Sequence, residues 1–219
     1  MGLNISKGNM YDFVTHTWNT VKGKCYHDCS YCYMKRYNDQ KDVYFDAKEL
    51  KTDLGKGNFI FVGSSCDLFA NDVKDEWILD TLKKMNEYDN KYLIQSKNPA
   101  RIIDFRSWLK KSTIVCTTIE TNRVYKDIMN NCPDPVNRAF GFRNLPFEKY
   151  ITIEPILDFD IDELVTLIRY CQPSKVNIGA DSGNNNLPEP SIEKIVKLVE
   201  ELKEFTTIEK KINLSRLEK

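Results

Sequence analysis

The sequence predicts an α/β protein built as an incomplete (β/α)6 barrel of the TIM type. Short apolar runs rich in β-branched and aromatic residues alternate with amphipathic helical stretches along most of the chain. This alternation favours a parallel sheet, and about six units are too few to close a full eight-unit barrel. The 219 residues, 41% of them hydrophobic, suffice for one core. We therefore expect a single domain over residues 1–219, with its core at about 15–205 and a charged tail at 206–219 that the pattern does not place.

The predicted strands are short and are bordered by turn-forming or polar residues. The first, at residues 15–21, combines threonines with Trp18 and runs directly into a cysteine-rich loop. The others are expected at residues 59–63, 92–95, 113–119, 150–153 and 175–179.

The predicted helices follow from capping residues and from apolar positions spaced at the helical period. Residues 33–37 are expected to be helical, and Asp46 is the expected cap of a short helix. A proline at an N1-like position opens the helix that begins near Pro99 and runs to 111. The remaining helices are expected at residues 75–88, 122–131, 136–141, 160–171 and 192–205.

Three cysteines, Cys25, Cys29 and Cys32, lie in one short loop at a Cys-x3-Cys-x2-Cys spacing. A structural zinc site usually needs four protein ligands in two separated pairs, and the sequence holds no second Cys-x2-Cys or His pair. Iron–sulfur clusters are held by Cys thiolates, so three cysteines on a four-iron cluster leave one iron open to a ligand that is not protein.

This triplet, with the aromatic Tyr31 just before its last cysteine, resembles the signature of the radical S-adenosylmethionine (SAM) superfamily. The resemblance implies a [4Fe–4S] cluster on Cys25, Cys29 and Cys32 whose open iron chelates SAM. It also implies reductive cleavage of SAM to a 5′-deoxyadenosyl radical, which abstracts hydrogen from a substrate. The incomplete barrel is the fold that the same resemblance implies.

A closer resemblance adds Gly23 and Tyr33, which flank the triplet as in the spore photoproduct lyase branch and in uncharacterised phage and prophage radical SAM proteins. Four further stretches, at residues 61–69, 95–101, 118–121 and 153–157, are similar to the phage relatives and fall in the same order. The resemblance covers roughly residues 15–183.

The carboxyl ends of the predicted strands carry the candidate cofactor residues, because these ends of a parallel barrel share one mouth. The candidates for SAM contacts are Tyr31, Gly63, Ser64, Ser65, Asp67, Ser96, Lys97, Glu120 and Glu154. The family often carries Gly-Gly-Glu after its second strand to hold the SAM amino group. Here that strand is followed by Gly-Ser-Ser, so Asp67 is the expected substitute. The resemblance places Tyr31 against the adenine, and Glu120 and Glu154 are candidates for ribose hydroxyls or for substrate.

Cys66 falls in a strand-end loop at the predicted mouth, where its thiol could donate a hydrogen atom to a product radical, as a cysteine does in spore photoproduct lyase. Simple buried packing is the competing interpretation for Cys66, and it is the expected role of Cys116, Cys132 and Cys171. We expect His27 to point toward solvent or the loop backbone rather than to bind metal.

Composition narrows the location and the partners. The net charge is zero, so indiscriminate nucleic-acid binding is not supported. No leader-like or membrane-spanning apolar run occurs and the cysteines are closely spaced, so we expect a cytoplasmic protein with no membrane contact. The expected partner is an electron donor such as a flavodoxin or ferredoxin. A nucleic acid or nucleoside is one candidate substrate, a peptide or small molecule another, and the oligomeric state stays open.

Two function hypotheses remain after this reasoning. The first is a radical SAM enzyme of unidentified substrate, with SAM either consumed or regenerated. The second is a non-catalytic metal-binding or electron-transfer module without SAM, in which the three cysteines hold zinc or a cluster together with His27 or Cys66. The barrel-like repeat and the aromatic Tyr31 agree with the signature, so the first hypothesis is favoured.

Overall fold

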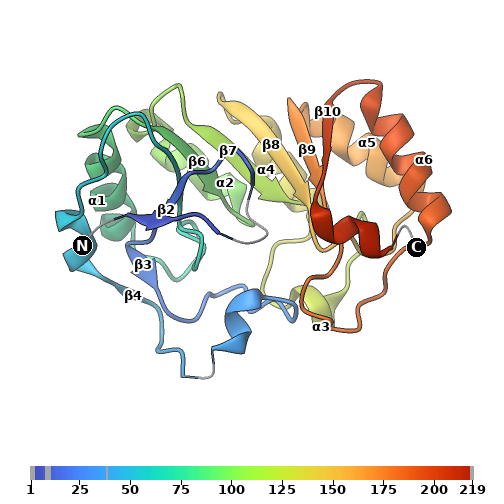
Figure 1. The fold of residues 1–219 in the computed structure, drawn as a ribbon, viewed down its shortest axis with the longest axis horizontal. Coiled ribbons are helices and arrows are strands. Elements are labelled where there is room, and N and C mark those ends of the chain that lie inside the picture. Colours follow the sequence, from blue (N-terminus) through green and yellow to red (C-terminus); the bar gives the residue numbers. More distant parts are fainter. Residues whose placement is uncertain (1–2, 8–10, 38, 218–219) are drawn as a thin grey trace.

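The computed structural model describes residues 3–7, 11–37 and 39–217, and its main element is an eight-stranded sheet (Figure 1). From edge to edge the sheet contains β1 (Asn4–Ile5), β2 (His16–Trp18), β5 (Phe59–Val62), β6 (Lys91–Gln95), β7 (Ile114–Thr118), β8 (Glu148–Ile153), β9 (Lys175–Ile178) and β10 (Thr207–Lys210). β1 pairs antiparallel with β2, and every pair from β2 to β10 is parallel. The expected incomplete barrel is confirmed.

The helices cover the outer face of this sheet (Figure 1). They are α1 (Asp75–Asn86), α2 (Pro99–Ile102), α4 (Pro135–Arg143), α5 (Ile161–Cys171) and α6 (Ile192–Lys203), with the short α3 (Lys126–Met129) apart from them near the ends of the strands. The helical turns are η1 (Tyr33–Arg36), η2 (Ala47–Lys51), η3 (Ile103–Trp108) and η4 (Ile212–Arg216). α5 shows why they pack there, because Leu164, Val165, Ile168 and Cys171 form one buried stripe.

Most predicted elements agree with the structure to within one or two residues, and the differences have local causes. The first strand is split, since the chain turns at 19–20 into β3 (Val21–Lys22), which pairs with β4 (Tyr44–Phe45). The helix expected from Pro99 to 111 becomes α2 followed by η3, and only 126–129 of the stretch 122–131 is helical. The unplaced tail supplies β10, whose charged residues hide its strand pattern.

The segment before β2 fills the interior of the barrel. Tyr11 packs against Phe61, Leu93 and Cys116, and its hydroxyl donates to Gln95 Oε1 at 2.7 Å. Phe13 stacks beside it at 5.4 Å between ring centroids. This aromatic packing closes the interior beneath Gln95, so space for a ligand lies beyond it, at the carboxyl ends of the strands. Among the described residues, no helix is long and apolar enough to cross a membrane.

Candidate functional site

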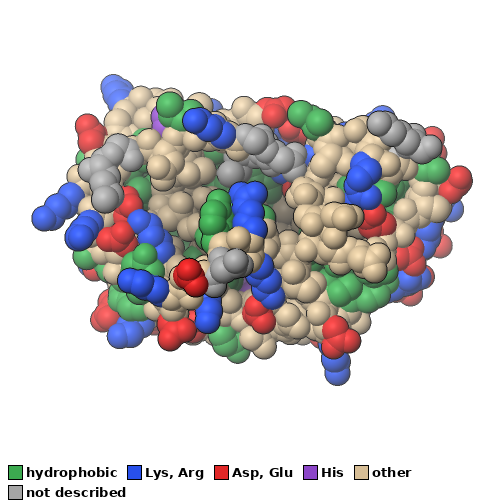
Figure 2. Space-filling view, turned by 60° about the horizontal axis from the view of Figure 1, so that its bottom comes forward, with side chains coloured by type: hydrophobic (Ala, Val, Ile, Leu, Met, Phe, Trp, Pro, Cys, Tyr) green, Lys and Arg blue, Asp and Glu red, His purple; other side chains and the backbone are tan. Residues whose placement is uncertain are grey.

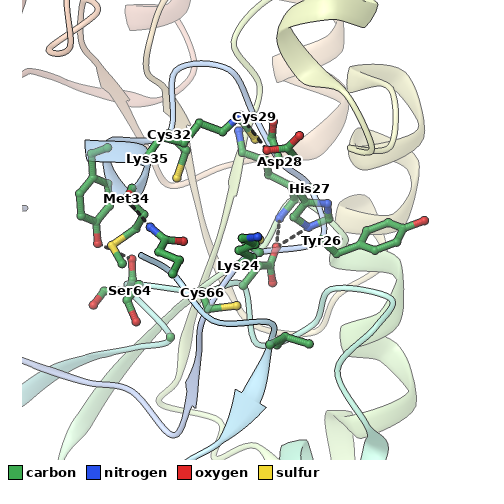
Figure 3. Close-up of a pocket in the computed structure, with 18 of the residues that line it drawn as sticks. Lys24, Tyr26, His27, Asp28, Cys29, Cys32, Met34, Lys35, Ser64 and Cys66 are labelled. Atoms are coloured by element: carbon green, nitrogen blue, oxygen red, sulfur yellow. Dashed lines mark hydrogen bonds and ion pairs between the residues drawn. The ribbon is translucent and has the colours of Figure 1, made fainter. Parts of the chain in front are cut away.

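A cavity of about 820 Å³ opens at the carboxyl ends of β5 and β6 (Figure 3). It brings together many of the residues expected from the sequence. Its wall includes the signature cysteines Cys25, Cys29 and Cys32, the candidate donor Cys66, and the SAM candidates Gly63, Ser64, Ser65, Asp67, Ser96 and Lys97. Tyr31, Glu120 and Glu154 are the candidates that do not line it.

The cysteine loop is held in shape by tight turns. Asp28 N donates to Cys25 O and Cys32 N donates to Cys29 O, both at 3.1 Å. Gly23 enters the loop at a φ of 99°, and a Cβ there would lie 2.5 Å from Asp42 O. A side chain at that position would therefore clash with the backbone, which explains the glycine before the triplet.

The three signature cysteines all line the wall of one cavity. Within the described part of the chain, no group of three or more Cys, His, Asp or Glu side chains is arranged to hold one metal ion. Iron–sulfur clusters are held by Cys thiolates, so these are the side chains here that could hold one.

Asp67 ties the cysteine loop to two strand ends. Its Oδ2 accepts from His27 Nε2 at 2.8 Å, from Ser96 Oγ at 3.0 Å and from Lys97 N at 2.8 Å, and its Oδ1 accepts from Phe69 N at 2.9 Å. Burial alone would raise the pKa of Asp67, but His27 and the backbone donors hold it below its usual range. The expectation that His27 points to solvent or the loop backbone was wrong, because its side chain is 2% exposed and faces Asp67.

Glu120 lies at the centre of a buried ion-pair network beneath the loop. Its Oε2 accepts from Arg138 Nη1 at 2.7 Å, and its Oε1 accepts from the Tyr31 hydroxyl and from Lys97 Nζ. Glu120 and Arg138 are both 0% exposed. Burial alone would raise the pKa of Glu120, but Arg138 and Lys97 hold it far below its usual range. Arg138 was missed by the sequence reasoning, since no local pattern distinguishes one arginine on a helix.

Glu154 lies elsewhere, past the end of β8. Its Oε2 accepts from Lys211 Nζ at 2.7 Å and its Oε1 from Asn213 Nδ2 at 3.0 Å. Both partners follow β10, so the carboxyl-terminal segment crosses this side of the mouth. Gly179 leaves room for the carboxylate, because a Cβ there would lie 2.9 Å from Glu154 Oε1.

Two further thiols flank the signature cysteines. Cys132 Sγ lies 3.3 Å from Cys29 Sγ. This thiol lowers the pKa of Cys29 to about 6, with help from Lys97 and against the effect of burial. Cys66 in turn lowers the pKa of Cys25. Cys66, Cys116 and Cys171 are buried as expected, whereas Cys132 is partly exposed and lies beside the signature loop. The contact between Cys132 and Cys29 was not predicted, because the two residues are 103 positions apart in the sequence.

Comparison with known proteins shows the fold. No protein-family model matches the chain, and no curated protein matches it. A cysteine-to-alanine variant of spore photoproduct lyase superposes with a TM-score of 0.67 at 10% identity, covering 94% of this chain and 80% of that one. The lyase complexed with dinucleoside spore photoproduct gives 0.56 at 9%, covering 92% and 64%. A double variant with bound AdoMet, which is SAM, and the dinucleoside gives 0.55 at 9%, covering 93% and 66%.

The chain thus spans about two thirds of the length of the two ligand-bound lyase structures. Its partly closed parallel barrel is the fold of these radical SAM enzymes.

Proposed function

We propose that this chain is a radical SAM enzyme in which Cys25, Cys29 and Cys32 hold a [4Fe–4S] cluster and the adjoining cavity holds SAM. The observation that carries the proposal is that all three signature thiols line one cavity at the carboxyl ends of the barrel strands. The fold similarity to a lyase solved with bound AdoMet supports it. When bound, the cluster and SAM together supply a 5′-deoxyadenosyl radical, which abstracts hydrogen from substrate.

In this proposal the loop after β5 contacts the methionyl end of SAM. Gly63 turns the chain at a φ of 78°, and the next residues line the cavity. Ser65 N and Ser64 Oγ both donate to Asn19 Oδ1, at 3.0 and 3.2 Å, which fixes this edge. Asp67 lines the same wall, and the contact with the SAM amino group is assigned to it. Its carboxylate also accepts hydrogen bonds from His27, Ser96 and Lys97. In this proposal Asp67 therefore both binds SAM and holds the cysteine loop in place.

Tyr31, Ser96 and Lys97 are assigned to the adenosyl end. Lys97 Nζ lies 4.9 Å from the centroid of the Tyr31 ring, so Tyr31, which does not itself line the cavity, packs against a side chain that does. Glu120 lies buried beneath both and acts by holding them in place. Glu154 is assigned to ribose or substrate on the far side of the mouth.

Cys66 is the proposed hydrogen-atom donor to the product radical. It lies on the wall of the cavity, opposite Cys32 in Figure 3, and is almost fully shielded from bulk water. Shielding suits a thiol that must react with a substrate radical and not with solvent species. The electron for SAM cleavage is assigned to a one-electron donor such as a flavodoxin or ferredoxin.

A nucleic acid is the proposed substrate class. Two exposed tyrosines follow the signature loop: Tyr33 and Tyr37 both line the cavity, and Tyr37 is 54% exposed. Arg36 lies between them, 5.5 Å from the Tyr33 centroid and 5.2 Å from that of Tyr37. Figure 2 shows basic side chains near the middle of one face of the molecule, interspersed with acidic ones. Aromatic rings beside cations stack unpaired bases without requiring a basic chain overall.

The cofactor proposal is tested by adding SAM to the anaerobically reconstituted, reduced protein. We expect the electron paramagnetic resonance spectrum of the cluster to change at saturating SAM, and 5′-deoxyadenosine to form, because one iron is open to the amino and carboxylate groups. If the spectrum of the cluster does not change when SAM is added, the radical SAM proposal is wrong and the electron-transfer module is favoured.

The substrate proposal predicts a specific loss of oligonucleotide binding. Tyr37→Ala should weaken binding of single-stranded DNA by about 1–3 kcal/mol, the usual contribution of one stacked base. Fluorescence anisotropy with a labelled oligonucleotide measures this. Tyr170→Ala is the matched control, because Tyr170 is similarly exposed but lies on the outer helix α5. Equal affinities of wild type and Tyr37→Ala would remove this tyrosine from the binding surface.

A further inference from the structure

The end of α3 and the segment that follows it pack directly onto the signature loop. Their backbone and amide side chains bond to the backbone of that loop: Asn131 N to His27 O (3.2 Å), Asn131 Nδ2 to Tyr26 O (2.9 Å), Asn130 Nδ2 to Asp28 O (2.6 Å) and Ser30 N to Ile128 O (2.9 Å). The contacts span the part of the loop between Cys25 and Cys32. They hold residues 128–132 at a fixed distance from the cysteines.

The Cys132 thiol is placed by this packing. Its backbone N–H donates to Met129 O at 3.1 Å, and its Sγ lies 3.3 Å from Cys29 Sγ and 3.9 Å from His27 O. A thiol carries one proton to donate, whereas a cysteine that ligates iron is a thiolate and can only accept. If Cys29 binds the cluster, the hydrogen bond between the two sulfurs therefore runs from Cys132 to Cys29.

We propose that the Cys132 thiol donates a hydrogen bond to the Cys29 thiolate when Cys29 ligates iron, and that this bond raises the reduction potential of the cluster. The inference rests on the function proposed above. Hydrogen bonds to the sulfurs help to set the potential of an iron–sulfur cluster. A donor stabilises the more negative, reduced form more than the oxidised form, because charge-assisted hydrogen bonds are the stronger ones. Cys132 is thus a positioning residue that acts through Cys29.

The positions of the four cysteines favour Cys132 as a hydrogen-bond donor to Cys29 over Cys132 as a fourth ligand of the cluster. Cys25, Cys29 and Cys32 all line the cavity, whereas Cys132 is not among the residues that line it, although its sulfur contacts that of Cys29. Thiolates on different irons of a four-iron cluster sit at separate corners, so two sulfurs in hydrogen-bond contact do not match two such ligands. One iron therefore stays open to SAM.

The test is a redox titration of the reconstituted protein, followed by electron paramagnetic resonance. Cys132→Ala should keep the iron content of wild type and its response to SAM, but titrate at a more negative midpoint potential. Cys132→Ser retains an O–H donor and should recover part of the shift. Cys171→Ala is the matched control, because it removes a buried thiol from the outer helix α5 and should titrate as wild type does.

A second measurement needs no substitution. In wild type, exchange into D2O should shift the Fe–S(Cys) stretching bands in the resonance Raman spectrum, because the donated S–H becomes S–D. The shift should be smaller in Cys132→Ala, where Cys66 beside Cys25 is the remaining thiol donor. An unchanged midpoint potential in Cys132→Ala, or no isotope shift in wild type, would overturn the inference and leave the proposed function intact. Loss of iron in both the Ala and Ser variants would make Cys132 a ligand and overturn it too. A wild type that assembles no cluster would overturn the function itself.

Discussion

Cys32→Ala should leave a folded protein that cannot retain its cluster, and SAM cleavage should fall to background with it. Each signature cysteine is one of only three thiolates proposed to hold the cluster, so losing one leaves two irons without a protein ligand. Cys32 is the best of the three for this test. It is only partly buried and begins η1 with an ordinary extended backbone, so removing its sulfur disturbs little packing. Iron content and 5′-deoxyadenosine after anaerobic reconstitution measure the outcome.

Cys171→Ala serves as the control for loss of a thiol. It lies in α5 with its sulfur 3.9 Å from Ala139 O, among apolar neighbours of the helix layer. We expect it to keep the full iron content and turnover at some cost in stability. Normal iron and turnover in Cys32→Ala would show that the signature does not hold the cluster, whatever the behaviour of the control.

The sequence predicted those features that depend on neighbours in the chain. Strands such as β5 and β7 are runs rich in β-branched and aromatic residues. The signature cysteines lie close together in sequence, between residues 25 and 32. Both kinds of pattern can be read without knowing the fold. The strand-end positions followed from the barrel, which is why Gly63, Asp67 and Lys97 were found together on one cavity wall.

The parts that could not be predicted depend on pairs far apart in the chain. Cys132 meets Cys29, and Arg138 meets Glu120, only because the segment after β7 folds back over the mouth. β10 was missed because its residues are exposed or half-buried, and the strand is defined by its pairing with β9 and its contacts with α6, not by its own composition. His27 was misjudged because its acceptor, Asp67, belongs to a different strand end. A single sequence does not show which distant residues will be in contact in the fold.

Glu120→Gln should be the most destabilising single change in the site, lowering the free energy of unfolding by about 3–5 kcal/mol. Gln cannot balance the guanidinium of Arg138, which is fully buried, or the ammonium of Lys97. The Arg138 guanidinium would then lie in the interior without a carboxylate, and that cost exceeds the loss of a single hydrogen bond. Urea unfolding of the cluster-free, reduced chain at pH 7 measures the difference.

The pH dependence of the same experiment identifies the carboxylate as the cause. Burial alone would raise the pKa of Glu120, but Arg138 and Lys97 lower it far below the value of about 4.3 that a glutamate has in an unfolded chain. A depressed pKa stabilises the folded state fully above the unfolded value, and the stabilisation is lost as the pH falls below it. The gap between wild type and Glu120→Gln should therefore be constant near neutral pH and narrow progressively below about pH 4.3.

A double variant separates the stabilising role of Glu120 from its role in the cofactor site. Glu120→Gln with Arg138→Met removes both members of the fully buried pair, and such replacements are often neutral, so most of the lost stability should return. SAM affinity should not return with it, because the acceptor that Tyr31 and Lys97 share would be a neutral amide oxygen in place of a carboxylate. We expect it to stay about 10-fold to 100-fold below wild type, the effect of one charged hydrogen bond of about 1.5–3 kcal/mol. Wild-type SAM affinity in a stable double variant would assign Glu120 to the fold alone, with Tyr31 and Lys97 positioned by the cavity wall.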